Sequence, residues 1–294
     1  MIKEILESFF KHKNKILISV LAGTLISCYL AFSTQDKYTS SVLLAPTDNS
    51  NIDQSASQLL NLGGLSSIVG MNASSAKTNL AVEILTSQSF ISDFVVNRDI
   101  LIELFAARKW DPKTRQLFID NKIYDEKNKL WVRDTNPPFS SAPNTQEAYR
   151  VWLDDHMKVS VDTQTQFVSI ELTYISPDHA QRWLYWLVED LNNRVRDKDI
   201  NQSERALKYL NFELKETSSD EIKTLLYRLI EQQTKIIMLA NTNKFYVLEI
   251  IDHPVIPYEK SSPFRLVMIL TGFILSFIFS SLLFFIYDFV RKEL

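Results

Sequence analysis

The histidines are the side chains best suited to acid–base chemistry or metal binding at neutral pH. They stand at His12, His156, His179 and His253. Histidines that share a metal ion stand at short, fixed spacing on one helix or hairpin, and no pair here has that spacing. We interpret each as an exposed or locally hydrogen-bonded side chain and expect no metal site.

Acidic pairs and serines are the next candidates for catalysis. In Asp154–Asp155 and Glu189–Asp190 the acids are neighbours in sequence, so their side chains should diverge rather than meet at one substrate atom. We interpret both pairs as solvated surface. No serine stands in the Gly-x-Ser-x-Gly pattern of a nucleophile elbow. The sequence therefore predicts a protein that is not an enzyme and needs no cofactor.

Three of the five glycines fall together, at Gly63, Gly64 and Gly70. A phosphate-binding loop requires Gly-x4-Gly-Lys-Ser/Thr, so that successive N–H groups and an ammonium meet the phosphates. Here Met71 follows the last glycine. We expect a flexible apolar loop that packs on the protein or faces a partner, and no nucleotide site.

Composition excludes two further classes of site. The 294 residues carry 32 Lys and Arg against 35 Asp and Glu, a net charge of -3, so no basic face for nucleic acid is indicated. Cys28 is the only cysteine, which rules out an intramolecular disulfide and a cysteine-based zinc site.

Uncharged apolar runs at both ends predict two membrane spans. Ile16–Phe32 and Leu266–Tyr287 contain no charged residue, and a bilayer core requires about 20 apolar residues. Basic residues precede the first run and follow the second: Lys3, Lys11, Lys13, Lys15, Arg291 and Lys292. The positive-inside rule then places both termini in the cytoplasm and the chain from Asp36 to Ser262 outside it.

The first run has an alternative interpretation. Leu25–Cys28 could be a lipoprotein cleavage box, and an ordinary cleaved signal peptide would also begin with a basic stretch and an apolar core. The run continues to Phe32, beyond the cleavage point, which favours an uncleaved anchor.

Short strands and helices are predicted between the spans. Strands are expected at 38–45, 157–161, 167–175 and 245–251, and two or three amphipathic helices at 78–105 with another at 146–156. The proline-containing segment 110–144 reads as an irregular surface excursion. Five tryptophans could stack on sugars, but Trp183 and Trp186 lie on an amphipathic helix and are interpreted as core.

A long helical hairpin is predicted before the last strand. Ser176–Pro177 gives an N-cap and a proline at the first helical position, and the apolar stripe that follows should lie on the sheet. The sequence then becomes polar without a helix breaker, and Ser218–Glu221 forms a capping box before a second stripe. The two helices would reach about 60 Å and 30 Å. Two helices bury little, so we expect contacts with further subunits.

A proline-rich segment leads into the second span. Pro254, Pro257, Ser262 and Pro263 have the spacing Pro-x2-Pro-x4-Ser-Pro. This pattern resembles the signature of Wzz-type chain-length determinants, the polysaccharide co-polymerases. Two departures are visible: Arg265 stands one position after the usual lysine, and the usual Gly-x3-Gly of the span is replaced by Gly272 and Ser276.

The resemblance implies an α+β membrane protein with a ferredoxin-like base. The expected parts are a cytoplasmic N-terminus (1–15), transmembrane helix 1 (16–34), a periplasmic α/β base (35–175), a helical hairpin arm (176–243), a base strand with the proline-rich segment (244–263), transmembrane helix 2 (264–287) and a cytoplasmic tail (288–294). So short a tail predicts no fused kinase domain.

The function that the resemblance implies is control of modal chain length, without bond formation, of O-antigen or a similar glycan. The protein would form a ring of several copies in the bacterial inner membrane and act with a Wzy-type polymerase on undecaprenyl-linked repeats. An export adaptor that activates a separate tyrosine kinase is the alternative, and a periplasmic carbohydrate-processing enzyme is a third.

Small residues in the second span predict a helix contact. Gly272 and Ser276 lie one turn apart on one face, which permits close approach of another helix. The partner could be the first span, a neighbouring copy or the polymerase, unless this face merely tolerates lipid.

Overall fold

The computed structural model describes residues 2–47 and 73–293, and the predicted glycine loop at Gly63, Gly64 and Gly70 lies outside them. The chain forms two compact units. One joins Met1–Tyr38 with Tyr258–Leu294, and the other is Thr39–Pro257. Each unit is described by itself.

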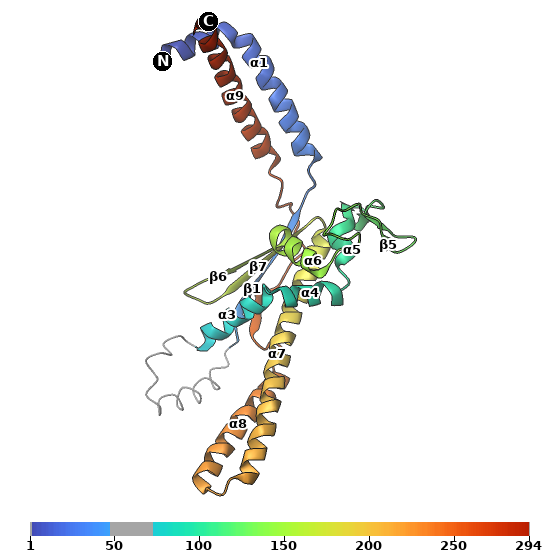
Figure 1. Ribbon diagram of the computed structural model, residues 1–294, viewed down its shortest axis with the longest axis vertical. Helices are drawn as coiled ribbons and strands as arrows, with labels where there is room; N and C mark the ends of the chain where they lie inside the picture. Colours follow the sequence, from blue (N-terminus) through green and yellow to red (C-terminus); the bar gives the residue numbers. More distant parts are fainter. Residues whose placement is uncertain (1, 48–72, 294) are drawn as a thin grey trace. The chain divides into compact units, whose positions relative to one another are not determined.

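Two long helices form the first unit. Helix α1 (Ile2–Ser33) and helix α9 (Arg265–Glu293) lie side by side, so that the N-terminal end of α1 and the C-terminal end of α9 are at the same end of the unit (Figure 1). Each contains a 20-residue segment long and apolar enough to cross a membrane, Asn14–Ser33 and Arg265–Phe284. The structure is therefore consistent with a two-pass membrane protein.

A four-stranded sheet organises the second unit, in the order β6-β7-β1-β8. The strands are β1 (Tyr38–Pro46), β6 (Met157–Val161), β7 (Val168–Tyr174) and β8 (Leu248–Asp252). Strands β6 and β7 form the predicted antiparallel hairpin, and β8 pairs antiparallel with β1. The neighbours β7 and β1, and likewise β1 and β8, thus come from distant parts of the chain.

Helices cover one face of this sheet. Along β7 the buried residues alternate (Val168, Ile170, Leu172 and Tyr174), as expected for a strand with one face in the core. The covering elements are α3 (Ala73–Leu85), α4 (Gln88–Asn97), α5 (Leu101–Ala106), α6 (Thr145–Val151), a π-helical turn (Trp152–His156) and the first half of α7. Trp152 and Trp183 are fully buried between them.

The segment predicted as an irregular excursion contains two small antiparallel ribbons, and in this respect the prediction was wrong. Strand β2 (Ala107–Asp111) pairs with β3 (Gln116–Ile119), and β4 (Tyr124–Asp125) pairs with β5 (Leu130–Trp131). These strands are two to five residues long, too short for a clear alternating pattern in the sequence.

The predicted hairpin is present as α7 (Pro177–Glu216) and α8 (Asp220–Thr242), which pack against each other (Figure 1). The Ser176 side chain accepts a hydrogen bond from His179 N–H, as predicted for the N-cap. Helix α7 runs for 40 residues without a break. The predicted capping box was wrong, because Ser219 is the N-cap of α8 and makes no side-chain cap bond.

Candidate functional site

Close contact between α1 and α9 involves both small residues predicted in the second span. A β-carbon added to Gly272 would overlap the side chain of Ser27, and one added to Gly23 would lie 2.5 Å from Ser276 Cβ. The Ser27 hydroxyl donates to the Met268 carbonyl of α9, at 2.8 Å. Within the unit, the face that carries Gly272 and Ser276 therefore lies against α1.

The α1 half of this contact was missed in the sequence although a signal was present. Gly23-x3-Ser27 has the same spacing as Gly272-x3-Ser276, which places a small residue and a hydroxyl one turn apart in each span. In the antiparallel pair each glycine faces the serine of the other helix. Two such motifs in two apolar helices are the pattern that could have predicted their pairing.

The proline-rich segment is divided between the two units. Pro254 and Pro257 belong to Thr39–Pro257, and Pro254 is buried. Its carbonyl accepts a hydrogen bond from Gln181 Nε2 on α7 at 3.2 Å. The next carbonyl, of Val255, accepts from Ser40 Oγ on β1 at 2.8 Å. This half of the segment is therefore fixed against the base.

Ser262, Pro263 and Arg265 belong to the unit of the two long helices. Ser262 is bridged to Lys37, whose N–H donates to the Ser262 carbonyl at 2.8 Å. Arg265 donates to Asp36 Oδ1 at 2.9 Å, and Lys260 donates to the same oxygen at 3.2 Å. One carboxylate beside the end of α1 thus joins two cations beside the start of α9.

Asp36 and Lys260 were not selected from the sequence. Asp36 is the first charged residue after the first apolar run, and Lys260 and Arg265 stand just before the second. An acid and two bases at corresponding ends of two spans is a recognisable signal for an ion pair. The Arg265 guanidinium also lies over the Phe32 ring, 5.2 Å from its centroid.

Asn192 connects the base of the arm to the start of β8. Its side-chain oxygen accepts hydrogen bonds from the backbone N–H groups of Tyr246, Val247 and Leu248 at 2.9 to 3.2 Å. Its amide nitrogen donates to the carbonyls of Val188 and Leu248. The predicted strand 245–251 begins only at Leu248, and the N–H groups of the two residues before it bind a side chain on α7 instead of a neighbouring strand.

Further polar contacts lie one and two turns along α7. Arg196 donates to the carbonyls of Asn243 and Lys244 at 2.9 Å, just after the end of α8. The Tyr246 hydroxyl donates to Asp199 at 2.6 Å. Burial raises the pKa of the Tyr246 phenol, and the hydrogen bond to Asp199 adds to this effect. The polar stretch of α7 therefore holds the chain that returns from the arm.

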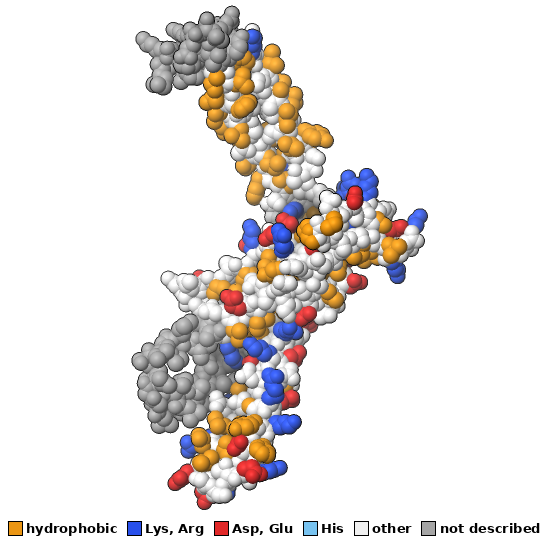
Figure 2. Space-filling model, viewed as in Figure 1, with side chains coloured by type: hydrophobic (Ala, Val, Ile, Leu, Met, Phe, Trp, Pro, Cys, Tyr) orange, Lys and Arg blue, Asp and Glu red, His pale blue; other side chains and the backbone are white. Residues whose placement is uncertain are grey.

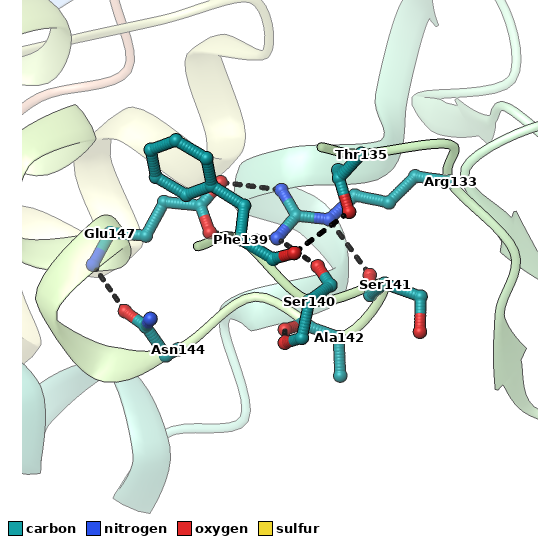
Figure 3. Close-up of polar contacts among 8 residues, drawn as sticks. All are labelled: Arg133, Thr135, Phe139, Ser140, Ser141, Ala142, Asn144 and Glu147. Atoms are coloured by element: carbon teal, nitrogen blue, oxygen red, sulfur yellow. Dashed lines mark hydrogen bonds and ion pairs between the residues drawn. The ribbon is translucent and has the colours of Figure 1, made fainter. Parts of the chain in front are cut away.

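Arg133 fixes the end of the second ribbon. Its guanidinium contacts both Glu147 carboxylate oxygens, at 2.5 and 2.7 Å, and donates to the Ser140 and Ser141 carbonyls (Figure 3). Glu147 lies in the first turn of α6, where its N–H is capped by Asn144. The ribbon is thus attached to the helical layer by a bidentate ion pair.

The candidate catalytic side chains lie apart or have structural partners. His156 Nδ1 lies 2.8 Å from the Thr173 carbonyl and His179 Nδ1 lies 2.8 Å from Ser176 Oγ, while His253 is exposed. Across residues 2–47 and 73–293, no group of three His, Cys, Asp or Glu side chains could hold a metal ion. Nothing is described for the side chain of His12.

For the pair Glu189–Asp190 the predicted divergence of the side chains was wrong, although Glu189 is exposed as predicted. Glu189 and Asp190 both bind the guanidinium of Arg98 on α4, at 2.9 and 2.5 Å. Adjacent residues on a helix point about 100° apart, but an arginine from a neighbouring helix is long enough to reach both. Asp154 and Asp155 are exposed, as predicted. Trp183 is buried in the core, whereas Trp186 is only partly buried beneath Arg98 and Arg182.

Apolar side chains remain exposed on the distal part of the arm, seen as orange patches over α7 and α8 in Figure 2. The large ones are Tyr209, Phe212, Ile222, Leu225, Tyr227 and Met238. Two helices cannot bury apolar residues on all their faces. The arm therefore offers apolar surface to a partner.

Comparisons with known proteins were made for the sequence and for the fold. The family model described as chain length determinant protein (Wzz) matches residues 2–97. No curated protein matches the sequence. A full-length bacterial polysaccharide co-polymerase is 12% identical, with 98% of this chain and 97% of that chain covered and a TM-score of 0.41. A fragment of WzzB, a polysaccharide co-polymerase from Salmonella Typhimurium, is 13% identical, with coverages of 78% and 100% and a TM-score of 0.31.

Proposed function

We propose that this chain, a Wzz-type protein by the match of its residues 2–97, controls the chain length of a bacterial surface polysaccharide. The match carries the proposal. It is supported by the proline-rich segment from Pro254 to Pro263, which resembles the same family and lies outside the matched residues. The protein would regulate polymer length and would make no glycosidic bond itself.

The proposed location is the bacterial inner membrane, with both termini cytoplasmic and Thr39–Pro257 in the periplasm. Two apolar 20-residue helical segments and the basic residues on their terminal sides support this topology. The small-residue contact between Gly23, Ser27, Gly272 and Ser276 would hold the two spans together within the bilayer.

For the periplasmic unit we propose a ferredoxin-like base. The strands follow one another as β1, β6, β7 and β8, with helices between the first two and between the last two, and the sheet order is β6-β7-β1-β8. Such a base would be a rigid support for α7, whose first half is buried on the sheet.

The active assembly is proposed to be a ring of several copies. The exposed apolar side chains of the arm, Tyr209 and Phe212 among them, would be covered by arms of neighbouring copies. The ring would act beside a Wzy-type polymerase that extends undecaprenyl-linked repeats, and the polymer would be O-antigen or a similar glycan.

The experiment that tests this function is gel analysis of surface polysaccharide from a deletion strain. Polymer should still be made, but the cluster of bands at the modal length should be lost, and the intact gene should restore it. Complete absence of polymer would point to synthesis instead. Unchanged lengths together with altered tyrosine phosphorylation of a separate kinase would replace length control by the adaptor function.

A further inference from the structure

The two ribbons form a basic projection of the second unit, which we call the ribbon lobe and define as residues 107–133. It contains eight Lys and Arg against four Asp and Glu, in a chain whose net charge is -3. In Figure 2, blue side chains gather at the rim of the region labelled α5 and β5 in Figure 1. The net charge of the lobe is thus positive, opposite in sign to the net charge of the whole chain.

Three of the four carboxylates in the lobe bind its own turns. Asp111 accepts from Lys113 N–H at 2.9 Å, Asp120 from Lys122 N–H at 3.0 Å, and Asp125 from Lys127 N–H at 3.0 Å. Asp120 also pairs with Arg108. The fourth acid, Glu126, is exposed. With all four acids counted, the lobe still carries an excess of positive charge.

The lysines of the lobe, unlike the three acids that bind its turns, are exposed and unpaired within the described part of the chain. All five are exposed, and none forms an ion pair with a described residue: Lys109, Lys113, Lys122, Lys127 and Lys129. Their ammonium groups are therefore available to an anionic partner. Surface lysines paired within the protein would not offer this charge.

Apolar side chains are interspersed among these lysines. Leu130 is 60% exposed, Phe118 53% and Val132 48%. Phe118 is the cross-strand partner of Lys109, so the two side chains leave the first ribbon on the same face. Leu130 follows the turn that carries Lys127 and Lys129. Lysines beside exposed apolar side chains are the pattern of a surface that binds anionic lipid headgroups.

The lobe is held rigidly to the base by two arginines. Arg133 pairs with Glu147 on α6, and Arg115 pairs with Asp178 in the first turn of α7. Neither arginine is free to collapse onto the lysine-bearing surface. The lobe therefore presents a fixed set of cations rather than a flexible tail.

Contacts within the second unit place the lobe where the chain enters that unit. Helix α5 leads directly into β2, and the Glu103 carbonyl of α5 accepts from the Tyr174 hydroxyl at 2.6 Å. The neighbouring Thr173 hydroxyl lies 2.7 Å from the Thr39 hydroxyl. Only residues 34–38 separate Thr39 from the end of α1, a reach of at most about 22 Å. The lobe is thus attached, within the second unit, to the part of the base at which the chain enters from α1.

We propose that the ribbon lobe docks on anionic lipid headgroups at the outer surface of the bilayer that contains α1 and α9. The lysine ammonium groups contact lipid phosphates, and Leu130 and Phe118 enter the headgroup layer. This inference rests on the membrane insertion in the proposed function. Docking would fix the base, and with it α7, at a defined angle to the membrane.

The test uses the full chain in lipid nanodiscs, with Cys28→Ala and a single fluorophore attached through Leu130→Cys. The discs contain phosphatidylcholine alone or with phosphatidylglycerol, and a trace of nitroxide-labelled lipid quenches fluorophores close to the bilayer. A label at Ile222→Cys on the arm, where the native side chain is 50% exposed, gives the background. A label at Leu282→Cys within the second span reports membrane insertion.

With phosphatidylglycerol, the label at position 130 should be quenched well above the label at position 222, and added salt should weaken the effect. When Lys127→Gln and Lys129→Asn are added to the protein labelled at position 130, the ratio of docked to undocked protein in these discs should fall about 25-fold, at roughly fivefold per lysine. Asn is chosen at 129 because it tolerates the positive φ of that residue. The matched arm variant Lys208→Gln with Lys215→Gln should change nothing.

Equal quenching at positions 130 and 222 in anionic discs, with position 282 strongly quenched, would overturn the docking and leave the membrane insertion intact. The docking proposal would also be overturned if quenching at position 130 were the same with and without phosphatidylglycerol, or the same with and without the two lysines. Absence of quenching at position 282 would contradict the membrane insertion of the second span, on which both proposals rest. These discs contain no partner protein and no glycan. If the lobe binds one of these instead of lipid, no lysine-dependent quenching should appear.

Discussion

Gly272 of α9 faces Ser27 of α1 so closely that a β-carbon on the glycine would overlap the serine side chain. The Ser27 hydroxyl, meanwhile, donates to the Met268 carbonyl one turn before Gly272. Lipid supplies no hydrophobic force between helices, so their association depends on this backbone approach and on polar contacts. The pair predicts which substitutions separate the helices and which of their effects are coupled.

Gly272→Ala should lower the thermal stability of the purified protein in detergent, at a cost of about 1–3 kcal/mol for the added methyl group. Ser27→Gly removes the atoms that the methyl group meets, but it also removes the hydrogen bond to Met268, so it should lower stability by itself. In the Ser27→Gly background, Gly272→Ala should therefore cost much less than in the native chain. Leu275→Ala, at an exposed position of α9, is the control and should have little effect. If Gly272→Ala costs as much in the Ser27→Gly background as in the native chain, the two residues are not in contact.

The membrane topology predicts opposite results for two reporter fusions. Alkaline phosphatase, which is active only outside the cytoplasm, should be active when joined after Gln202 and inactive when joined at Leu294. The reason is the position of the basic residues on the terminal side of each span. Activity of the Leu294 fusion would contradict the proposed topology.

The arm predicts an effect on assembly. Tyr209→Ser with Phe212→Ser removes two exposed aromatic side chains of α7 and should reduce the number of copies per particle, measured by light scattering of the purified protein. Phe118→Ser, at a similarly exposed position outside the arm, should leave the particle mass unchanged. An unchanged mass in the arm variant would show that these side chains do not join the copies.

Asn192 predicts a large loss of stability. Asn192→Leu leaves three buried backbone N–H groups without their acceptor, and we expect the free energy of unfolding to fall by about 3–5 kcal/mol. Urea denaturation followed by circular dichroism measures this change. Asn201→Ala, at an exposed position of the same helix, should stay within about 0.5 kcal/mol of the native protein.

Tyr174 predicts a loss of stability at alkaline pH. Burial raises the pKa of the Tyr174 phenol far above its usual value, and the Glu103 carboxylate adds to the shift. The folded protein therefore keeps this proton above about pH 10, where the unfolded chain releases it. The contribution is complete below about pH 10 and is lost as the pH rises, by about 1.4 kcal/mol per pH unit.

Urea denaturation of Tyr174→Phe at a series of pH values above about 10 checks this prediction, because the variant should lack that part of the decline. Tyr174→Phe also loses the hydrogen bond to the Glu103 carbonyl, which lowers the stability of the variant equally at every pH. This loss does not by itself change how steeply stability falls with pH. Tyr227→Phe, at an exposed position, serves as the control. Equal slopes for Tyr174→Phe and the native protein would contradict the prediction.

The elements that follow from local patterns could be predicted from the sequence. Two uncharged runs of sufficient length became α1 and α9, and Ser176–Pro177 began a 40-residue helix because an N-cap, a favourable first residue and the absence of breakers act within a few residues of one another. The β6–β7 hairpin followed from alternation on both sides of a short turn.

Only the tertiary structure decided the contacts between residues far apart in the chain. Gly272 required a partner helix, and the sequence left three candidates because the spacing Gly-x3-Ser describes one face and not what covers it. Arg98 of α4 forms ion pairs with both Glu189 and Asp190 of α7, and no residue spacing within α7 could indicate this. Asn192 delays the start of β8 because its amide binds backbone groups more than 50 residues away. Local pattern sets which elements form, and packing sets which side chains meet.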